Sequence, residues 1–220
     1  MPPRSTRSPS VLPRTTRTRG RVPDVSVVVP LYNEEESLRE LFTAIASSLH
    51  QTKRSFEVIF VDDGSTDRSF DVLTDLHQRH PAVVRVIRFR RNYGKSPALA
   101  VAFREARGRY VVTMDADLQD DPAEIPALLE ALGTEYDLIS GWKKKRFDPL
   151  TKTIPSRFFN FVTAKLTGIP IHDFNCGLKA YRREVVKDVH VYGELHRYIP
   201  ALAHWAGYRV GEKVVQHHPR

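Results

Sequence analysis

The chain has 220 residues, of which 41% are hydrophobic and 27% are charged, a composition typical of one compact folded domain with a tail. Its single cysteine, Cys176, excludes an internal disulfide framework and a cysteine zinc cluster, and fits a reducing, cytosolic compartment. No run of about 20 apolar residues appears in the sequence, so neither a membrane-spanning helix nor a signal peptide is predicted.

The net charge of +8 is concentrated near the N-terminus. Six arginines precede the first acidic residue, Asp24, so six of these net charges lie in the tail and +2 remains for the rest of the chain. This distribution argues against a nucleic-acid-binding domain, although a basic arm is attracted to an anionic membrane surface. Residues 1–22 are predicted to be a disordered basic tail, and residues 23–220 a single folded domain.

From Val25 onward, short β-branched runs alternate with helical periodicity, which is typical of βαβ units and predicts an α/β fold with a mostly parallel sheet. The predicted strands are Val25–Pro30, Phe56–Asp62, Val83–Phe89, Arg109–Asp115, Asp137–Ser140 and Tyr208–Gln216. The predicted helices are Leu38–Leu49, Ser69–His80, Pro97–Arg107, one that begins near Pro122, Phe158–Leu166 and Glu194–Trp205. The basic, proline-interrupted segment Trp142–Arg157 is predicted to be a long surface loop.

Acidic residues follow three of the predicted strands, in the segments 33–36, 62–67 and 115–121. Ligands of open parallel sheets bind at the carboxyl ends of the strands. We therefore expect the three acidic loops to share one edge of the sheet and to form the functional site there.

Asp115 and Asp117 are the best candidates for a metal site. In an extended segment, residues two apart face the same way, so both carboxylates can reach one divalent cation, and Gln119 is a third candidate ligand. Such oxygen ligands suit Mg²⁺ or Mn²⁺, which also bind substrate phosphates. The spacing leaves a second interpretation open, in which the acidic turn only caps the helix that begins near Pro122.

The loop after the second strand also has two interpretations. The segment DGSTD is good turn chemistry, in which Thr66 or Asp67 caps the following helix. Alternatively, Asp62 takes part in ligand recognition beside the first acidic loop. The position of both loops after buried strands of one sheet favours the functional interpretation.

Four segments together resemble a known family: VVVPLYNEEESL, FEVIFVDDGSTD, RNYGKSPALAVAFREARGRYVVTMDADLQDDP and DFNCGLKAYRREVV. The chain resembles the family 2 glycosyltransferases of GT-A fold, and within them the polyprenyl-phosphate and dolichyl-phosphate branch. The resemblance extends from about Val25 to Arg220. It implies a single Rossmann-like catalytic domain that transfers a sugar, with inversion, from a UDP- or GDP-linked donor to a lipid phosphate.

The resemblance also implies roles for particular residues. The nucleotide would contact Pro30, Tyr32, Glu34, Asp62, Asp115 and Ala116. The metal would be held by Asp115, Asp117 and Gln119, and the catalytic residues would be Asp117 and Asp173. The acceptor is a phosphate already anionic near neutral pH, so Asp173 would orient it more than deprotonate it.

A lipid phosphate needs cationic partners, because guanidinium and ammonium groups match phosphate oxygens. The candidates are Arg146 and Arg157 in the basic loop, with Lys179 and Arg197 further along the chain. The alternative for the basic loop is a solvated charged surface. Such an acceptor would place the enzyme on the cytoplasmic face of a membrane, as the resemblance implies. Because similar enzymes continue into hydrophobic helices, a C-terminal membrane segment or a separate membrane-anchoring subunit is expected.

Four alternatives stay open on the sequence alone. The first is a glycosyltransferase whose acceptor is a saccharide hydroxyl. The second is a phosphatase of the haloacid dehalogenase type, although its motif is expected near the start of the chain. The third is a basic nucleic-acid-binding protein, and the fourth is a sugar-nucleotide binder without activity.

Overall fold

The computed structural model describes residues 22–133, 135–144, 160, 163–165, 167–169 and 171–219. The basic tail up to residue 21 lies outside these residues. So do most of the predicted loop Trp142–Arg157 and most of the predicted helix Phe158–Leu166. The domain boundary at residue 23 therefore stays a prediction.

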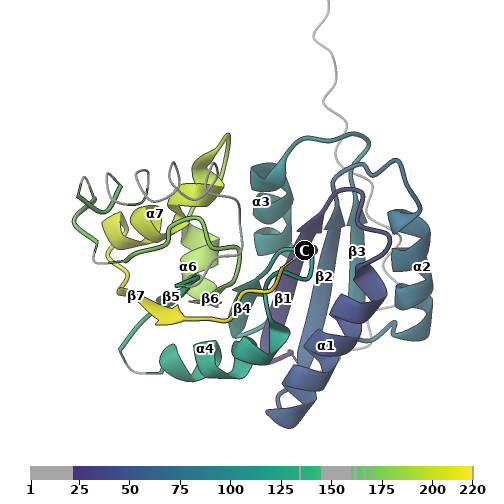
Figure 1. Cartoon of the computed structure of the whole chain (residues 1–220), viewed down its shortest axis with the longest axis horizontal. Coiled ribbons are helices and arrows are strands. Elements are labelled where there is room, and N and C mark those ends of the chain that lie inside the picture. The colour runs from purple at the N-terminus through teal and green to yellow at the C-terminus, as the bar shows by residue number, and fades with distance from the viewer. Residues whose placement is uncertain are drawn as a thin grey trace, which may run out of the picture.

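The described part of the chain forms one seven-stranded sheet in the order β3-β2-β1-β4-β6-β5-β7 (Figure 1). The strands are β1 (Val25–Leu31), β2 (Phe56–Asp62), β3 (Val84–Arg88), β4 (Tyr110–Thr113), β5 (Leu138–Trp142), β6 (Lys179–Arg182) and β7 (Val210–Val214). Neighbouring strands are parallel except for β6, which is antiparallel to both β4 and β5. The predicted α/β fold with a mostly parallel sheet is confirmed.

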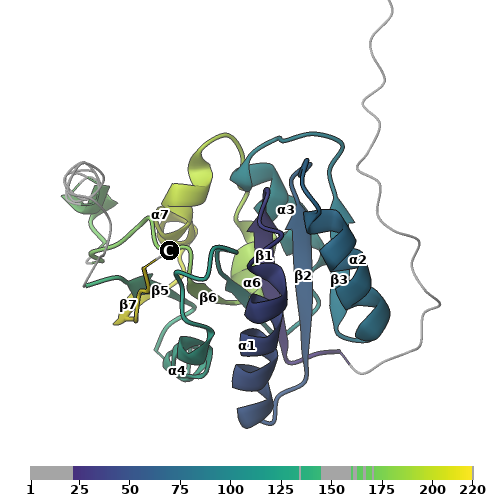
Figure 2. The ribbon, with the colours of Figure 1, turned by 45° about the vertical axis from the view of Figure 1, so that its right-hand side comes forward.

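Helices cover both faces of the sheet, as Figures 1 and 2 show. One face packs against α1 (Leu38–Gln51), α2 (Ser69–Arg79) and α4 (Ile125–Ala131). The other packs against α3 (Lys95–Glu105), α6 (Arg183–Asp188) and α7 (Ile199–Trp205). Side chains of a strand alternate between faces, so Val27 and Val29 of β1 enter the first core and Val28 the second. In the described residues, no helix combines the length and apolarity needed to cross a bilayer.

Two 3₁₀ helices complete the fold: η1 (Pro122–Glu124), directly before α4, and η2 (Leu195–Tyr198), directly before α7. The helix predicted near Pro122 corresponds to η1 followed by α4. The helix predicted at Glu194–Trp205 corresponds to η2 followed by α7. The predicted third helix, Pro97–Arg107, is found two residues earlier, at Lys95–Glu105.

The sequence pattern missed β6 and α6, which follow each other without a break at Lys179–Arg182 and Arg183–Asp188. Strand β6 has four residues, begins with Lys179 and ends with Arg182, so it lacks the apolar run that identified the other strands. Its place between β4 and β5 buries Lys179, Ala180 and Tyr181 nonetheless. Tertiary packing, not local propensity, fixes this strand.

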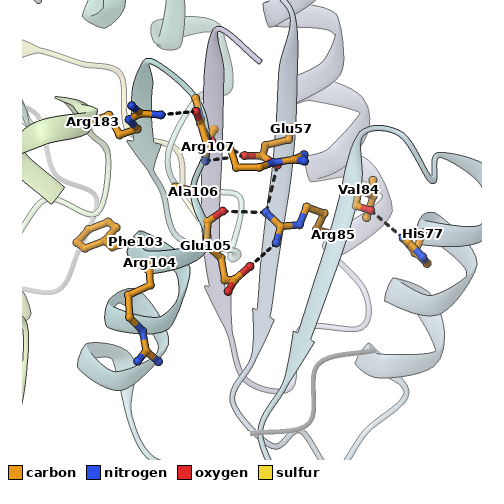
Figure 3. A network of polar contacts seen from close by, with 12 residues as sticks. Glu57, His77, Val84, Arg85, Phe103, Arg104, Glu105, Ala106, Arg107 and Arg183 are labelled. Atoms are coloured by element: carbon orange, nitrogen blue, oxygen red, sulfur yellow. Dashed lines mark hydrogen bonds and ion pairs between the residues drawn. The ribbon is translucent and has the colours of Figure 1, made fainter. Parts of the chain in front are cut away.

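A polar network lies at the N-terminal edge of the sheet, where the parallel strands β1, β2 and β3 begin (Figure 3). Glu57 of β2 is 1% exposed, and its carboxylate accepts hydrogen bonds from Ser26 Oγ (2.7 Å), Arg107 Nη2 (2.7 Å) and Arg85 Nη1 (3.3 Å). Arg85 also donates to Glu105, through Nη2 to Oε2 at 2.5 Å. The network joins β1, β2 and β3 to the segment that connects α3 to β4.

Candidate active site

A cavity of about 340 Å³ lies at the C-terminal edge of the sheet, between the ends of β1 and β4, the start of β6, and the helices α3 and η2. Its charged or imidazole side chains are Lys95, Asp115, Lys179, His196 and Arg197. The wall formed by η2 is fixed to α3 by the buried Ser96, whose Oγ lies 2.9 Å from His196 Nδ1. One carboxylate thus faces several basic groups, an arrangement that suits an anionic ligand.

Asp115 is held between a lysine and a glycine. Lys95 Nζ donates to Asp115 Oδ1, and a Cβ atom placed on Gly177 would lie 2.5 Å from Asp115 Oδ2, so only glycine lets the chain approach so closely. Burial raises the pKa of Asp115, but the ammonium groups of Lys95, Lys143 and Lys179 together outweigh burial and hold this pKa below its ordinary value. The carboxylate is therefore ionised and available as a ligand.

A second ion pair braces the loop after β4. Asp120 is 1% exposed, and its Oδ1 lies 2.7 Å from Nζ of Lys143, the residue directly after β5. The other oxygen, Oδ2, accepts from the backbone N–H of Asp115 at 3.4 Å. Lys143 thus ties the end of β5 to the loop that carries Asp115.

Asp117 and Gln119 lie in this loop, beyond the end of β4 at Thr113, and neither lines the cavity. The chain turns at Leu118, whose φ of 60° is left-handed, and Asp117 Oδ1 accepts from the backbone N–H of Gln119 at 3.2 Å. The alternation of an extended strand therefore does not set the direction of these side chains. The helical cap comes from Asp121, whose Oδ1 accepts from Ala123 N at 2.8 Å.

The donor set fits a hard divalent cation. Among the described residues no three His, Cys, Asp or Glu side chains converge on one point, so the chain offers at most the two carboxylates of Asp115 and Asp117. Mg²⁺ and similar ions are commonly bound by one or two carboxylates together with substrate phosphates and water. The site suits an ion that shares its coordination with a diphosphate. The role of Gln119 as a ligand stays a prediction.

The nucleotide candidates lie along the ends of β1, β2 and β4, but only Pro30 and Asp115 of this set line the cavity. Tyr32 is 43% exposed, Glu34 is half-buried and Ala116 is buried. These roles stay predictions.

Asp62 is fully buried, and its carboxylate accepts from Ser65 N at 2.8 Å and lies 3.5 Å from Arg88 Nε. Its contact with a base edge stays a prediction too. The neighbouring Asp67 has the structural role considered for it, because its Oδ1 accepts from Ser69 N at 2.9 Å at the start of α2.

The acceptor candidates differ in their positions. Lys179 forms part of the cavity lining, is 4% exposed and donates to the carbonyl oxygen of Cys176, whereas Arg197 is an exposed side chain at the cavity wall. Asp173 is 1% exposed, accepts from Asn175 N at 3.1 Å and does not line the cavity. Arg146 and Arg157 lie outside the described residues.

The profile of the family described as "Glycosyl transferase family 2" matches residues 26–190. The chain belongs to this family. The predicted resemblance is thereby confirmed, and the matched residues include the whole Asp115 loop and strand β6.

Curated relatives agree with the polyprenyl-phosphate branch of the glycosyltransferases. The chain is 39% identical, over 90% of its length and 60% of the relative, to a dodecaprenyl-phosphate galacturonate synthase of Rhizobium johnstonii. It is 40% identical, over 81% of its length and 53% of the relative, to an undecaprenyl-phosphate 4-deoxy-4-formamido-L-arabinose transferase of Pseudomonas aeruginosa. The chain thus spans little more than half the length of these relatives.

Solved structures share the GT-A fold with this glycosyltransferase. A mannosyltransferase of Pyrobaculum calidifontis in complex with GDP-Man and Mn²⁺ matches with a TM-score of 0.66 and 24% identity, over 96% of this chain and 60% of that one. Glucosyl-3-phosphoglycerate synthase of Mycobacterium tuberculosis, in complex with Mn²⁺ and UDP-glucose, gives a TM-score of 0.65 and 21% identity, over 90% and 72%. At this identity, the likeness establishes the fold.

Three residues at the site of this glycosyltransferase were not assigned a role from the sequence: Asp120, Lys143 and Gly177. Each was visible as a polar or glycine residue within two positions of a strand or helix. Their partners, however, lie far away in the sequence, so no local spacing revealed the contacts.

Proposed function

We propose that the chain transfers a sugar from a UDP- or GDP-linked donor to the phosphate of a polyprenyl or dolichyl lipid. The observation that carries the proposal is the cavity in which Asp115 lies among Lys95, Lys179 and Arg197. Donor and acceptor both bear phosphate, and ammonium and guanidinium groups are natural partners of phosphate oxygens. The curated relatives named for polyprenyl-phosphate sugar chemistry support the same substrate class.

Asp115 and Asp117 would hold Mg²⁺ or Mn²⁺, which when bound neutralises the charge that develops on the departing diphosphate. Pro30, Tyr32, Glu34, Asp62 and Ala116 would position the nucleotide beside it. Lys95 lies close enough to Asp115 to contact the same diphosphate. In this arrangement the residues around β4 stabilise the leaving group.

The reaction would be a single in-line displacement with inversion. An oxygen of the lipid phosphate attacks the anomeric carbon, the bond from that carbon to the diphosphate breaks, and the electron pair leaves with the nucleotide. The attacking phosphate is already anionic near pH 7, since its second pKa is about 6. A general base is therefore hardly needed to remove a proton from it. Asp173 would therefore orient the acceptor, while Lys179, Arg197, Arg146 and Arg157 would bind its charge.

A buried cation supports the anionic acceptor in particular. Burial lowers the pKa of Lys179 below its ordinary value, because a buried ammonium is poorly solvated. An anion that enters the cavity would compensate this cost. A saccharide hydroxyl, the alternative acceptor, would bring no charge with which to do so.

A lipid acceptor places the reaction at a membrane surface, and the free, buried thiol of Cys176 fits the reducing cytoplasmic side. The basic residues of the N-terminal tail would add attraction to anionic lipids. A separate membrane-anchoring subunit remains part of this proposal as a possible partner.

The test is a panel of labelled UDP- and GDP-sugars, each offered with polyprenyl phosphate and Mn²⁺ or Mg²⁺, and scored for labelled lipid. We expect one donor to give product that disappears with EDTA or with Asp115→Ala. Transfer to a saccharide instead of the lipid would support the alternative acceptor. Full activity of Asp115→Ala would contradict the assignment of the metal site.

A further inference from the structure

Lys95 is in direct contact with Asp115, the carboxylate proposed to bind a divalent cation. Lys95 Nζ donates to Asp115 Oδ1, and the backbone of Gly177 lies against Oδ2 on the other side. Both side chains are about one third exposed, 33% for Lys95 and 34% for Asp115, so the pair borders the cavity and is accessible from it. While Lys95 stays in place, a divalent cation on Asp115 would lie beside the ammonium of Lys95.

Lys95 is held there by its backbone. It is the first residue of α3, and the preceding Gly94 adopts a φ of 94°, which favours glycine. The carboxylate of Asp63 accepts from the backbone N–H groups of Tyr93 at 2.7 Å and Gly94 at 2.8 Å. The start of α3 is thus fixed, and only the side chain of Lys95 is left to move.

Charge makes the two states of Asp115 exclusive. The ammonium of Lys95 is paired with the carboxylate of Asp115 through their direct contact. An ammonium and a divalent cation on one carboxylate oxygen would repel each other strongly in a partly buried site. A metal that binds Asp115 must therefore displace Lys95, whose ammonium then needs another anion.

We propose that Lys95 competes with the divalent cation for Asp115, and releases it when a nucleotide diphosphate takes over the lysine ammonium. This inference rests on the proposed function, because it assumes that Asp115 is a metal ligand and that the donor carries a diphosphate. Lys95 is then a residue that couples the binding of metal to the binding of donor. Its removal should have opposite effects on the two ligands, which a purely structural residue would not have.

The experiment measures Mn²⁺ binding to the full chain without nucleotide, by the electron paramagnetic resonance signal of free Mn²⁺. Lys95→Met removes the charge and keeps an unbranched side chain that is one atom shorter, and Lys95→Arg keeps the charge. We expect Lys95→Met to bind Mn²⁺ at least about fivefold more tightly than the unchanged chain, within the usual range of coupling between sites. Lys144→Met, which removes an exposed charge beside Trp142, is the matched control and should change the affinity little.

The second arm measures UDP and GDP binding by calorimetry at saturating Mn²⁺. Here Lys95→Met should bind the preferred nucleotide about tenfold more weakly, because a charge-assisted contact is lost, and Lys95→Arg should retain most of the affinity. Equal or weaker Mn²⁺ binding by Lys95→Met, including no measurable binding by either protein, overturns the inference. So does unchanged nucleotide affinity.

Asp115→Asn separates this inference from the proposed function. If Asp115→Asn loses Mn²⁺ binding while Lys95→Met gains none, only the competition by Lys95 is wrong. If Asp115→Asn binds Mn²⁺ as tightly as the unchanged chain, the metal site itself is wrong. Thermal unfolding of each variant shows whether the fold is retained.

Discussion

The two edges of the sheet use charge differently. At the edge where the parallel strands begin, the carboxylate of Glu57 is surrounded by donors from Ser26, Arg85 and Arg107. At the opposite edge, the single carboxylate of Asp115 faces a cavity that Lys179 and Arg197 also line. The first edge has its charges paired within the protein, whereas the second has basic groups suited to ligand anions. One edge should therefore govern stability and the other binding and turnover.

The largest expected effect is on turnover. Asp115→Asn should lower kcat by about 10³-fold or more, because metal stabilisation of a leaving group contributes several kcal/mol. The fold should be retained, as checked by thermal unfolding. Asp71→Asn, which changes an exposed carboxylate of α2, is the matched control and should keep full activity. Comparable activity of the two variants would contradict the assignment of turnover to the edge that carries Asp115.

The next effect is on stability. Glu57→Gln should lower the free energy of unfolding by about 3 kcal/mol, because it leaves Arg85 and Arg107 without their shared buried carboxylate. The measurement is denaturant unfolding at pH 7, with Glu130→Gln on the exposed side of α4 as control, expected within about 0.5 kcal/mol. The kcat of the folded fraction should be unchanged. A large loss of kcat would show that the edges are not independent.

A smaller effect on turnover is expected from Gly177→Ala at the C-terminal edge of the sheet, beside Asp115. The new methyl group would meet Asp115 Oδ2 at 2.5 Å and force the carboxylate to move. Overpacking of this kind costs about 1–3 kcal/mol, so we expect about a 10- to 100-fold loss in kcat/KM. Gly133→Ala, after α4, is the control, since its closest contact is the carbonyl oxygen of Glu130 at 3.2 Å. Unchanged Mn²⁺ affinity in Gly177→Ala would mean that the carboxylate tolerates the shift.

The smallest effect is a change in acid sensitivity. Burial raises the pKa of Glu57, but hydrogen bonds from Arg107 and Ser26, together with the charge of Arg85, outweigh burial and hold this pKa below its ordinary value of 4.5. A carboxyl with a lowered pKa contributes stability above its unfolded pKa, and this contribution is lost as the pH falls through the folded pKa. Stability should thus fall less steeply below pH 4.5 in Glu57→Gln than in the unchanged chain. Parallel curves from denaturant unfolding would refute this role.

The sequence predicted β1, β2, β3 and β4 well because each is a largely buried run, rich in β-branched residues, whose pattern is local. The prediction Phe56–Asp62 coincides with β2, and the alternation of Val27, Val28 and Val29 between two cores follows from helices on both faces. Strand β6 was missed because it has four residues with a lysine at its start. Its pairing with β4 and β5 depends on residues distant in the sequence.

The site was predictable in its location but not in its contacts. The rule that ligands bind at strand ends placed Asp115 correctly at the C-terminal edge, beside the cavity. It could not pair Lys95 with Asp115 or Lys143 with Asp120, because these pairs join different loops of the folded chain. Asp62 shows the same limit, since its partner Arg88 comes from the next strand.

The reversed direction of β6 has a consequence for how such a chain can diversify. Strand β5 ends at Trp142 on the C-terminal edge of the sheet, where the cavity lies, and β6 begins at Lys179 on that same edge. The intervening segment therefore leaves the sheet and returns to it at one place. A segment of different length or composition could be exchanged there without altering a single strand pairing. The sheet and the segment between Trp142 and Lys179 would thus be separable units of inheritance.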